Sequence, residues 1–223
     1  MHALVNNAGI CVFSEFDFCT TKQIEDQISV NLLGTIRLTR ELLPLLIKGK
    51  GRIVNVSSVN AMQVFPGTSI YAATKKAIEA FGDGLRMELQ KFSVQVVTVR
   101  LGDYARLTDI MAKHGAVVAE QVAEMDDLKK VRYGDYFDRF HRSALANYGY
   151  FSPPSFQQSS LFADFEEAVL ANIPHSYIVS ATWSYKALLY FLVALPITYS
   201  DALIRRFTKS MMEEGGELRK KRT

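Results

Sequence analysis

Short apolar runs alternate with long helical stretches, and this alternation restricts the possible folds more than any other feature of the sequence. Residues 1–5, 52–56 and 94–99 are rich in aliphatic and β-branched side chains, which is typical of buried strands. Residues 21–48 and 69–91 carry apolar side chains at helical spacing. The order strand, helix, strand predicts right-handed crossovers and a parallel sheet. Because the strands are apolar throughout, we expect helices on both faces of that sheet.

The pattern loosens after Gly102, where the sequence becomes more polar and more aromatic. We expect one further strand at residues 177–179 and a helix over 159–172, separated from the first half by a less regular segment. That segment contains two predicted helices, near 106–113 and 117–131, and an aromatic, polar stretch over 133–151. We therefore predict one domain over residues 1–223, with residues 1–102 as one half and 103–223 as a second half of helices and a last strand.

Composition and charge exclude several classes of protein. The excess of 26 basic over 23 acidic residues is only +3, so nucleic acid is not an expected partner. Two cysteines exclude a disulfide-dense scaffold and a four-cysteine zinc site, and we expect Cys11 and Cys19 to be reduced thiols. The four histidines have no metal-ligand spacing, and we expect no metal site. They are His2, His114, His141 and His175.

Three polar residues have a spacing that suggests catalysis. Tyr71 and Lys75 stand at positions i and i+4 of the second predicted helix, so both side chains leave the same face. Ser58 follows a predicted strand closely, and ligands of open parallel sheets bind beyond the carboxyl ends of the strands. A phenol can take the proton of an alcohol only if its pKa falls from about 10 toward neutrality. A lysine ammonium nearby favours the phenolate, and a serine hydroxyl can hold the substrate oxygen.

These residues, together with two asparagine motifs, resemble the short-chain dehydrogenase/reductase family. The motifs are Asn6-Asn7-Ala8-Gly9, Asn31 within Ser29–Gly34, Ser58, and Tyr71-Ala72-Ala73-Thr74-Lys75 thirteen positions after that serine. The resemblance runs in order from residue 1 to about residue 110 and more loosely to about residue 205. It implies a Rossmann-like, doubly wound α/β fold and an oxidoreductase that uses NAD or NADP.

The resemblance also implies a role for each matching residue. Tyr71 would be the general acid/base, Lys75 would lower the pKa of Tyr71 and hold the nicotinamide ribose, and Ser58 would orient the substrate oxygen. Asn31 would support a water-mediated proton relay to the lysine. The implied cofactor-binding residues are Asn6, Ala8, Gly9, Tyr71, Lys75 and Gly102. The two long helices would pair in a homo-oligomer of the full-length form.

The sequence departs from the family pattern in two places. Leu101-Gly102 stands where the family usually has Pro-Gly beside the nicotinamide, and Gly102 keeps the close approach that only glycine allows. The Gly-rich pyrophosphate loop that should precede Asn6 is absent, and neither Gly49-Lys50-Gly51 nor Gly82-Asp83-Gly84 has the right context. The chain opens inside a predicted strand, and we expect no charged leader, signal peptide or N-terminal anchor from these residues. We therefore expect a truncated Rossmann-like sheet that is missing its first three strands.

Within the family, the chain is most similar to the branch of retinol dehydrogenases, 17β-hydroxysteroid dehydrogenase type 2 and mitochondrial 3-hydroxybutyrate dehydrogenase. The similarity rests on Tyr133–Phe137 and on Leu195-Pro196 followed by Ser200-Asp201. It implies an alcohol or carbonyl substrate on a hydrophobic carrier, such as a steroid or retinoid, or a small hydroxy acid. It also implies an intracellular protein, associated with a mitochondrial or endoplasmic-reticulum membrane.

Several alternatives stay open. The apolar segment 187–195 is too short to span a bilayer, so it forms a buried or interface helix or lies against a membrane. The basic tail 219–223 is a frayed end, an aid to membrane attachment or a dilysine retrieval signal. The whole chain could also be a catalytically silent fragment that acts at most as an interaction module. An extended sugar epimerase shares the serine and Tyr-x-x-x-Lys motif but fits the compact C-terminal half less well.

Overall fold

A four-stranded parallel sheet forms the centre of the molecule in the computed structural model, which describes residues 1–220. The strands are β1 (Ala3–Asn6), β2 (Arg52–Ser58), β3 (Gln95–Leu101) and β4 (Tyr177–Ser180), and they lie side by side in sequence order. Every neighbouring pair is parallel. All four carboxyl ends therefore meet at one edge of the sheet, as the sequence pattern predicted.

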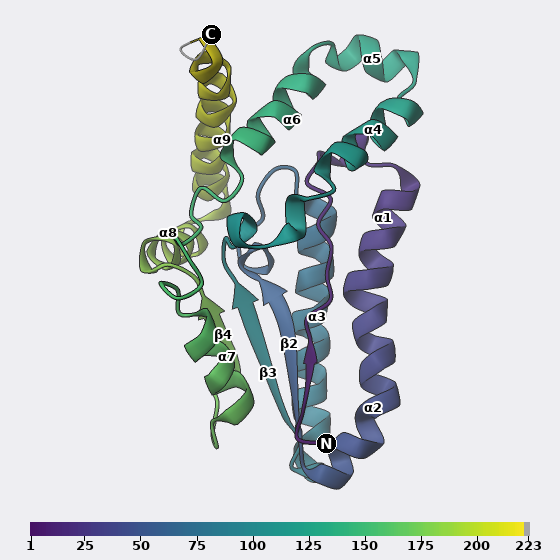
Figure 1. Cartoon of the computed structure of the whole chain (residues 1–223), viewed down its shortest axis with the longest axis vertical. Coiled ribbons are helices and arrows are strands. Elements are labelled where there is room, and N and C mark those ends of the chain that lie inside the picture. Colours follow the sequence, from purple (N-terminus) through teal and green to yellow (C-terminus); the bar gives the residue numbers. More distant parts are fainter. Residues whose placement is uncertain (221–223) are drawn as a thin grey trace.

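Helices cover both faces of this sheet, so the doubly wound α/β architecture is confirmed (Figure 1). One face carries a long rod, made of α1 (Thr21–Gln27), a π-helical segment (Ile28–Gly34) and α2 (Thr35–Gly49), together with α3 (Ser69–Leu89). The other face carries α7 (Leu161–Leu170), which contacts β2, β3 and β4.

The alternation of side chains along the strands explains why both faces are apolar. Ile53 and Val96 pack with Leu46 of α2 and Leu89 of α3 on one side. Their chain neighbours Val54 and Val97 pack with Ala168 of α7, among others, on the opposite side. All these side chains are buried, which is the pattern expected of parallel strands enclosed between two helical layers.

The segment between β3 and β4 differs from the expected pair of helices. Residues 106–113 do not form a helix: two short 3₁₀ turns, Ala105–Leu107 and Asp109–Met111, flank Thr108, whose backbone is extended. The predicted helix over 117–131 is two helices, α4 (His114–Glu124) and α5 (Asp127–Tyr133). They separate because Asp126 adopts an extended conformation and caps α5 by accepting a hydrogen bond from the Lys129 amide.

The remaining helices lie above the carboxyl edge of the sheet and beside it (Figure 1). The aromatic stretch contains α6 (Tyr136–Asn147), which packs against α9 (Ile197–Lys220), and α8 (Trp183–Ala194) precedes α9. The basic tail 219–223 lies at and beyond the end of the described residues. Within the described residues, no helix has the length and apolar character needed to cross a bilayer. The division into halves at residue 102 stays a prediction.

Candidate active site

Ser58 is the last residue of β2 and lies at the carboxyl edge of the sheet. Its backbone is extended, and its hydroxyl oxygen accepts a hydrogen bond from the Asn60 amide, 3.2 Å away. Ser58 is buried, and it is a side-chain hydrogen-bond partner of Tyr71. The structure therefore brings the predicted serine and tyrosine together.

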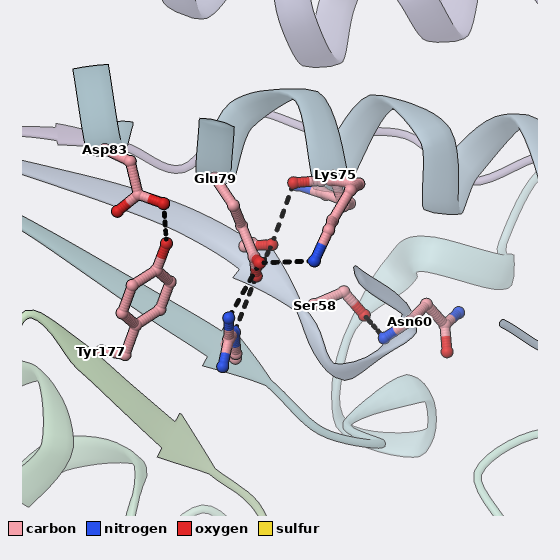
Figure 2. A network of polar contacts seen from close by, with 9 residues as sticks. Ser58, Asn60, Lys75, Glu79, Asp83 and Tyr177 are labelled. Atoms are coloured by element: carbon pink, nitrogen blue, oxygen red, sulfur yellow. Dashed lines mark hydrogen bonds and ion pairs between the residues drawn. The ribbon is translucent and has the colours of Figure 1, made fainter. Parts of the chain in front are cut away.

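Tyr71 and Lys75 both lie in the first turns of α3, next to the end of β2. The Lys75 ammonium donates a hydrogen bond to the carbonyl oxygen of Val56, 3.0 Å away, and lies 5.7 Å from the centre of the Tyr71 ring. Figure 2 shows Lys75 projecting from α3 toward the strands, with Ser58 nearby on β2. The three predicted catalytic side chains therefore converge at one edge of the sheet.

Burial sets the protonation of this cluster. Burial raises the pKa of the Tyr71 phenol, the neighbouring Cys11 thiol adds to the rise, and the hydrogen bond with Ser58 opposes it. The expected fall of the Tyr71 pKa beside Lys75 is therefore not found, because desolvation outweighs the favourable contacts. Burial lowers the pKa of the Lys75 ammonium from 10.5 to about 8. Both shifts favour the neutral form of the group because a charge loses its hydration in a buried site. Lys75 thus has a pKa close enough to neutrality to exchange a proton readily.

Asn31 lies in the π-helical segment and is completely buried. Its side-chain oxygen accepts from the Ile10 amide at 2.8 Å, and its amide nitrogen donates to the Ile10 carbonyl at 2.9 Å and to the Thr74 hydroxyl at 3.0 Å. The single side chain joins the loop after β1 to the turn of α3 that precedes Lys75. Single-turn π segments occur often at functional sites, and here one positions an asparagine between the two partners.

Gly9 lies against both of these residues. A Cβ at this position would stand 3.1 Å from the Lys75 nitrogen and 3.5 Å from the Asn31 side-chain oxygen. Only glycine leaves the loop this close to the ammonium without displacing it. Gly9 and the neighbouring Ala8 are exposed, so this part of the Asn-Asn-Ala-Gly motif faces outward beside Lys75.

Asn6, in contrast, points into the core. Its amide nitrogen donates to the Thr39 hydroxyl and to the Asn55 side-chain oxygen, each at 2.9 Å. Asn6 and Asn55 are register partners in β1 and β2, and both are buried. Asn6 therefore fixes the end of β1 to β2 and α2, and in this structure its side chain contacts other core residues.

Gly102 is held against β4. Its amide donates to the Ser180 carbonyl at 2.7 Å, and a Cβ would come within 2.5 Å of the Ala181 Cβ. The need for glycine at this position is therefore explained by the close packing of the loop after β3 against the end of β4. The proline that the family usually has before this glycine is not required for that contact.

The structure reveals one neighbour of the cluster, and one buried pair elsewhere, that the sequence does not indicate. Cys11 lies close enough to Lys75 and Tyr71 to influence the pKa of both, and burial raises the pKa of its own thiol to about 12. Both cysteines are free thiols, as expected. His114 and His141, which show no ligand spacing in the sequence, have ring nitrogens 3.3 Å apart in the buried space between α4 and α6. No sequence signal marks these contacts, because they join segments that are distant in the chain.

Several aromatic side chains of the stretch over 133–151 pack against one another and against Phe18. Phe18 lies edge-to-face with Tyr133 and Phe137, with ring centres 4.7 Å and 4.9 Å apart. Phe151 stacks on Tyr185 of α8 at 4.4 Å. These contacts pack aromatic rings against one another, as in a core.

Comparison with known proteins agrees with this geometry. The family model described as short chain dehydrogenase matches residues 1–117, a stretch that contains the serine, the tyrosine and the lysine. The chain belongs to the short-chain dehydrogenase family. The predicted membership is therefore confirmed.

Individual relatives extend the match beyond residue 117. Mitochondrial D-beta-hydroxybutyrate dehydrogenase of Mus musculus is 35% identical over 79% of this chain and 51% of its own length. Estradiol 17-beta-dehydrogenase 2 of Rattus norvegicus is 31% identical over 94% of this chain and 55% of its own. Retinol dehydrogenase 7 of Rattus norvegicus is 32% identical over 90% of this chain and 62% of its own. The match thus spans only about half to three fifths of these relatives.

Proposed function

We propose that this chain carries the active-site half of an NAD(P)-dependent oxidoreductase that interconverts an alcohol and a carbonyl. The observation that supports this most directly is the convergence of Ser58, Tyr71 and Lys75 at the carboxyl edge of the sheet. The substrate is a hydrophobic alcohol or ketone, such as a steroid or retinoid, or a small hydroxy acid. Relatives named for hydroxybutyrate, estradiol and retinol support this range.

We assign each side chain of the cluster a role in this reaction. The Tyr71 hydroxyl gives a proton to, or takes one from, the substrate oxygen, and Ser58, hydrogen-bonded to Tyr71, orients that oxygen. Lys75, whose pKa is about 8, favours the phenolate when its ammonium is protonated. Asn31 keeps the loop around Ile10 and the Thr74 turn of α3 in place beside Lys75, where the proton relay would run.

The residues fit one half of the cofactor. Lys75 would hold the nicotinamide ribose beside Tyr71, and Gly9, which is exposed beside the ammonium, would lie next to that ribose. The nicotinamide, when bound, donates or accepts the hydride. In the sequence of the described residues, no strand leads through a Gly-x-Gly-x-x-Gly turn into a helix, so the pyrophosphate has no such cradle there.

Titration of this chain with NAD(H) and NADP(H), followed by nicotinamide fluorescence, tests the proposal against the silent-fragment alternative. Saturable binding that Lys75→Met weakens supports the cofactor role, whereas an absence of binding supports a silent interaction module. In a form of the protein that turns over, Tyr71→Phe should lower kcat by roughly 100-fold or more, as expected for the loss of a general acid/base. The exposed Tyr199→Phe is the matched control. Unchanged turnover in Tyr71→Phe contradicts the role of Tyr71.

We further propose that α8 and the start of α9 touch a membrane surface. One face of α8 packs inward through Tyr185 and Leu189, whereas Trp183 is 82% exposed and Ile197 is 76% exposed. Arg205 and Arg206 follow on α9 and are exposed, and they suit anionic headgroups. These features support a peripheral location on a mitochondrial or endoplasmic-reticulum membrane. Because Trp183 is the only tryptophan, a blue shift of its fluorescence with anionic but not neutral vesicles tests this contact directly.

The exposed apolar side chains of the two long helices support a homo-oligomer. Leu38 and Leu45 of α2 and Met87 of α3 are all exposed. Burial of such side chains favours association. Sedimentation of the chain, compared with that of Leu38→Ser/Leu45→Ser, should show the variant shifted toward monomer. A monomeric parent chain contradicts the oligomer for this form of the protein.

A further inference from the structure

Glu79 places a carboxylate in the core one helical turn after Lys75. The residue is 2% exposed, although α3 offers solvent on its other side. Its two oxygens accept hydrogen bonds from Arg100 on β3, one from Nε at 2.8 Å and one from Nη2 at 2.9 Å. A bidentate, charge-assisted pair of this kind fixes both distance and orientation. It therefore fixes the separation and rotation of α3 relative to β3.

The same carboxylate also reaches β2 through Ser57. The Ser57 hydroxyl oxygen lies 3.0 Å from Glu79 Oε1 and 3.2 Å from the backbone carbonyl oxygen of Lys75. Ser57 is the register partner of Arg100 and directly precedes Ser58. Val56, whose carbonyl accepts from the Lys75 ammonium, lies on the other side of Ser57. Glu79 thus holds the strand segment that carries both the candidate catalytic serine and the acceptor of the candidate catalytic lysine.

A second carboxylate on α3 extends the network to β4. The Arg100 guanidinium stacks on the Tyr177 ring, 4.1 Å from its centre, and the Tyr177 hydroxyl donates to Asp83 at 2.7 Å. Figure 2 shows Lys75, Glu79 and Asp83 projecting from one side of α3 toward the strands. Asp83 contacts the last strand and leaves β2 untouched, so it belongs to the same network without touching the catalytic cluster.

The Glu79–Arg100 network restricts the arrangement of α3 and β3 more than apolar packing would. Removing a carboxylate and a guanidinium from water costs free energy, and apolar side chains would fill this space at least as stably. A buried network restricts the accepted arrangement of its members. From these contacts we infer that Glu79 is a positioning residue, which, through Ser57 and Arg100, holds Lys75 and Ser58 in the arrangement that proton transfer requires. This inference rests on the proposed function of that cluster, but its test does not need turnover.

The test measures the Lys75 ammonium in the chain itself. Lysine side chains labelled biosynthetically with ¹³C are titrated by NMR through their Cε signals, and the Lys75 signal is assigned by its loss in Lys75→Arg. In the parent chain the burial of Lys75 gives it a pKa of about 8. Glu79→Gln keeps the size of the side chain but removes the charge that holds Arg100, so β2 and α3 separate enough to admit water. The Lys75 pKa should then rise toward 10.5.

Asp83→Asn is the matched control, because it changes the next carboxylate of the same network without touching β2. The control should leave the Lys75 pKa at the parent value, even if it lowers the free energy of unfolding as much as Glu79→Gln does. A merely structural role for Glu79 predicts that both variants behave alike. A Lys75 pKa in folded Glu79→Gln that equals the parent value overturns the inference.

Ser57→Ala keeps the inference falsifiable if Glu79→Gln does not fold. This variant removes the hydroxyl between Glu79 and the Lys75 carbonyl but leaves the Glu79–Arg100 ion pair in place. It should raise the Lys75 pKa in the same direction, and Ser57→Thr, which restores a hydroxyl, should return the pKa toward the parent value. An unchanged pKa in Ser57→Ala likewise overturns the positioning role. A parent chain that does not bind NAD(H) would contradict the proposed function. It would leave the Lys75 pKa measurements, and what they say about Glu79, unchanged.

Discussion

Gly9 lies against the ammonium of Lys75 in the candidate active site, so close that even a Cβ at position 9 would crowd it. A Cβ at position 9 would lie 3.1 Å from the Lys75 nitrogen, so that nitrogen would have to give way by a few tenths of an ångström. The loop after β1 and the first turns of α3 therefore share one surface. This contact ties the Asn-Asn-Ala-Gly motif physically to the Tyr-x-x-x-Lys motif.

Gly9→Ala should therefore disturb Lys75 while costing about 1 kcal/mol or less in the free energy of unfolding. The new methyl group pushes the ammonium away from its position, and its pKa should move away from about 8. Gly84→Ala is the control, since nothing lies within 4 Å of its Cβ position in α3. That change should stabilise the chain by about 0.5–1 kcal/mol. Chemical denaturation measures the free energies of unfolding, and NMR of the lysine side chains measures the Lys75 pKa. An unchanged Lys75 pKa in Gly9→Ala would show that position 9 has space for a methyl group without displacing the ammonium.

Lys75 should make the chain more stable as the pH rises through the range about 8 to about 9. The folded lysine, with a pKa of about 8, releases its proton while the unfolded lysine, at 10.5, keeps it. The unfolded state then binds more protons, so the free energy of unfolding rises with pH. The rise should be about 1 kcal/mol over this range.

The matched variant for this prediction is Lys75→Met, in which the lysine contribution to the slope disappears. Measurement should stop near pH 9, because the Cys11 thiol contributes the opposite slope between 9.0 and about 12. Urea unfolding at a series of pH values checks the difference between parent and variant. Equal slopes in the two proteins would mean that Lys75 is not buried as the structure shows.

The buried pair of His114 and His141 should make the chain sensitive to acid. Burial, and then the neighbouring His114 ring, lowers the pKa of His141 from 6.5 to about 4. Burial also lowers the pKa of His114. Between pH 6.5 and about pH 4 the unfolded chain binds protons that the folded chain does not bind. The free energy of unfolding therefore falls as the pH drops below 6.5. The His141 contribution amounts to about 3 kcal/mol over the full range.

His141→Gln should flatten this acid dependence, whereas the exposed His2→Gln should leave it unchanged. Urea unfolding between about pH 7 and about pH 5 measures both slopes. A His141→Gln variant that loses stability with acid as steeply as the parent chain contradicts the assignment.

The hydrogen bond between Tyr136 and Glu15 should stabilise the packing of α6 against the segment before α1. The Tyr136 hydroxyl donates to the Glu15 carboxylate at 2.5 Å and joins α6 to the segment that leads into α1. Tyr136→Phe should lower the free energy of unfolding by about 1–2 kcal/mol, since the acceptor is charged. A double-mutant cycle with Glu15→Gln measures the pair directly, and a coupling energy of zero would show that solvent replaces the bond without cost.

Local patterns in the sequence predicted the parallel sheet, the two long helices and the meeting of Ser58, Tyr71 and Lys75 at one edge. Strand and helix periodicity depend only on local side-chain pattern, and Tyr71 and Lys75 are one helical turn apart. The apolar residues Ile53, Val54 and Val56 marked β2 as a buried strand, whereas the burial of Asn55 could not be read from its residue type. The spacing of apolar residues does not show where a capping residue interrupts a helix. The predicted helix over 117–131 therefore did not include the break at Asp126.

The contacts between distant segments become visible only in the folded structure. The burial of Glu79 against Arg100, the meeting of His114 with His141, and the inward direction of Asn6 each join residues from different elements. No local pattern records such pairings, because each depends on how strands and helices dock. The same docking sets the pKa of Lys75, since the same ammonium on an isolated helix would remain hydrated and keep its ordinary value.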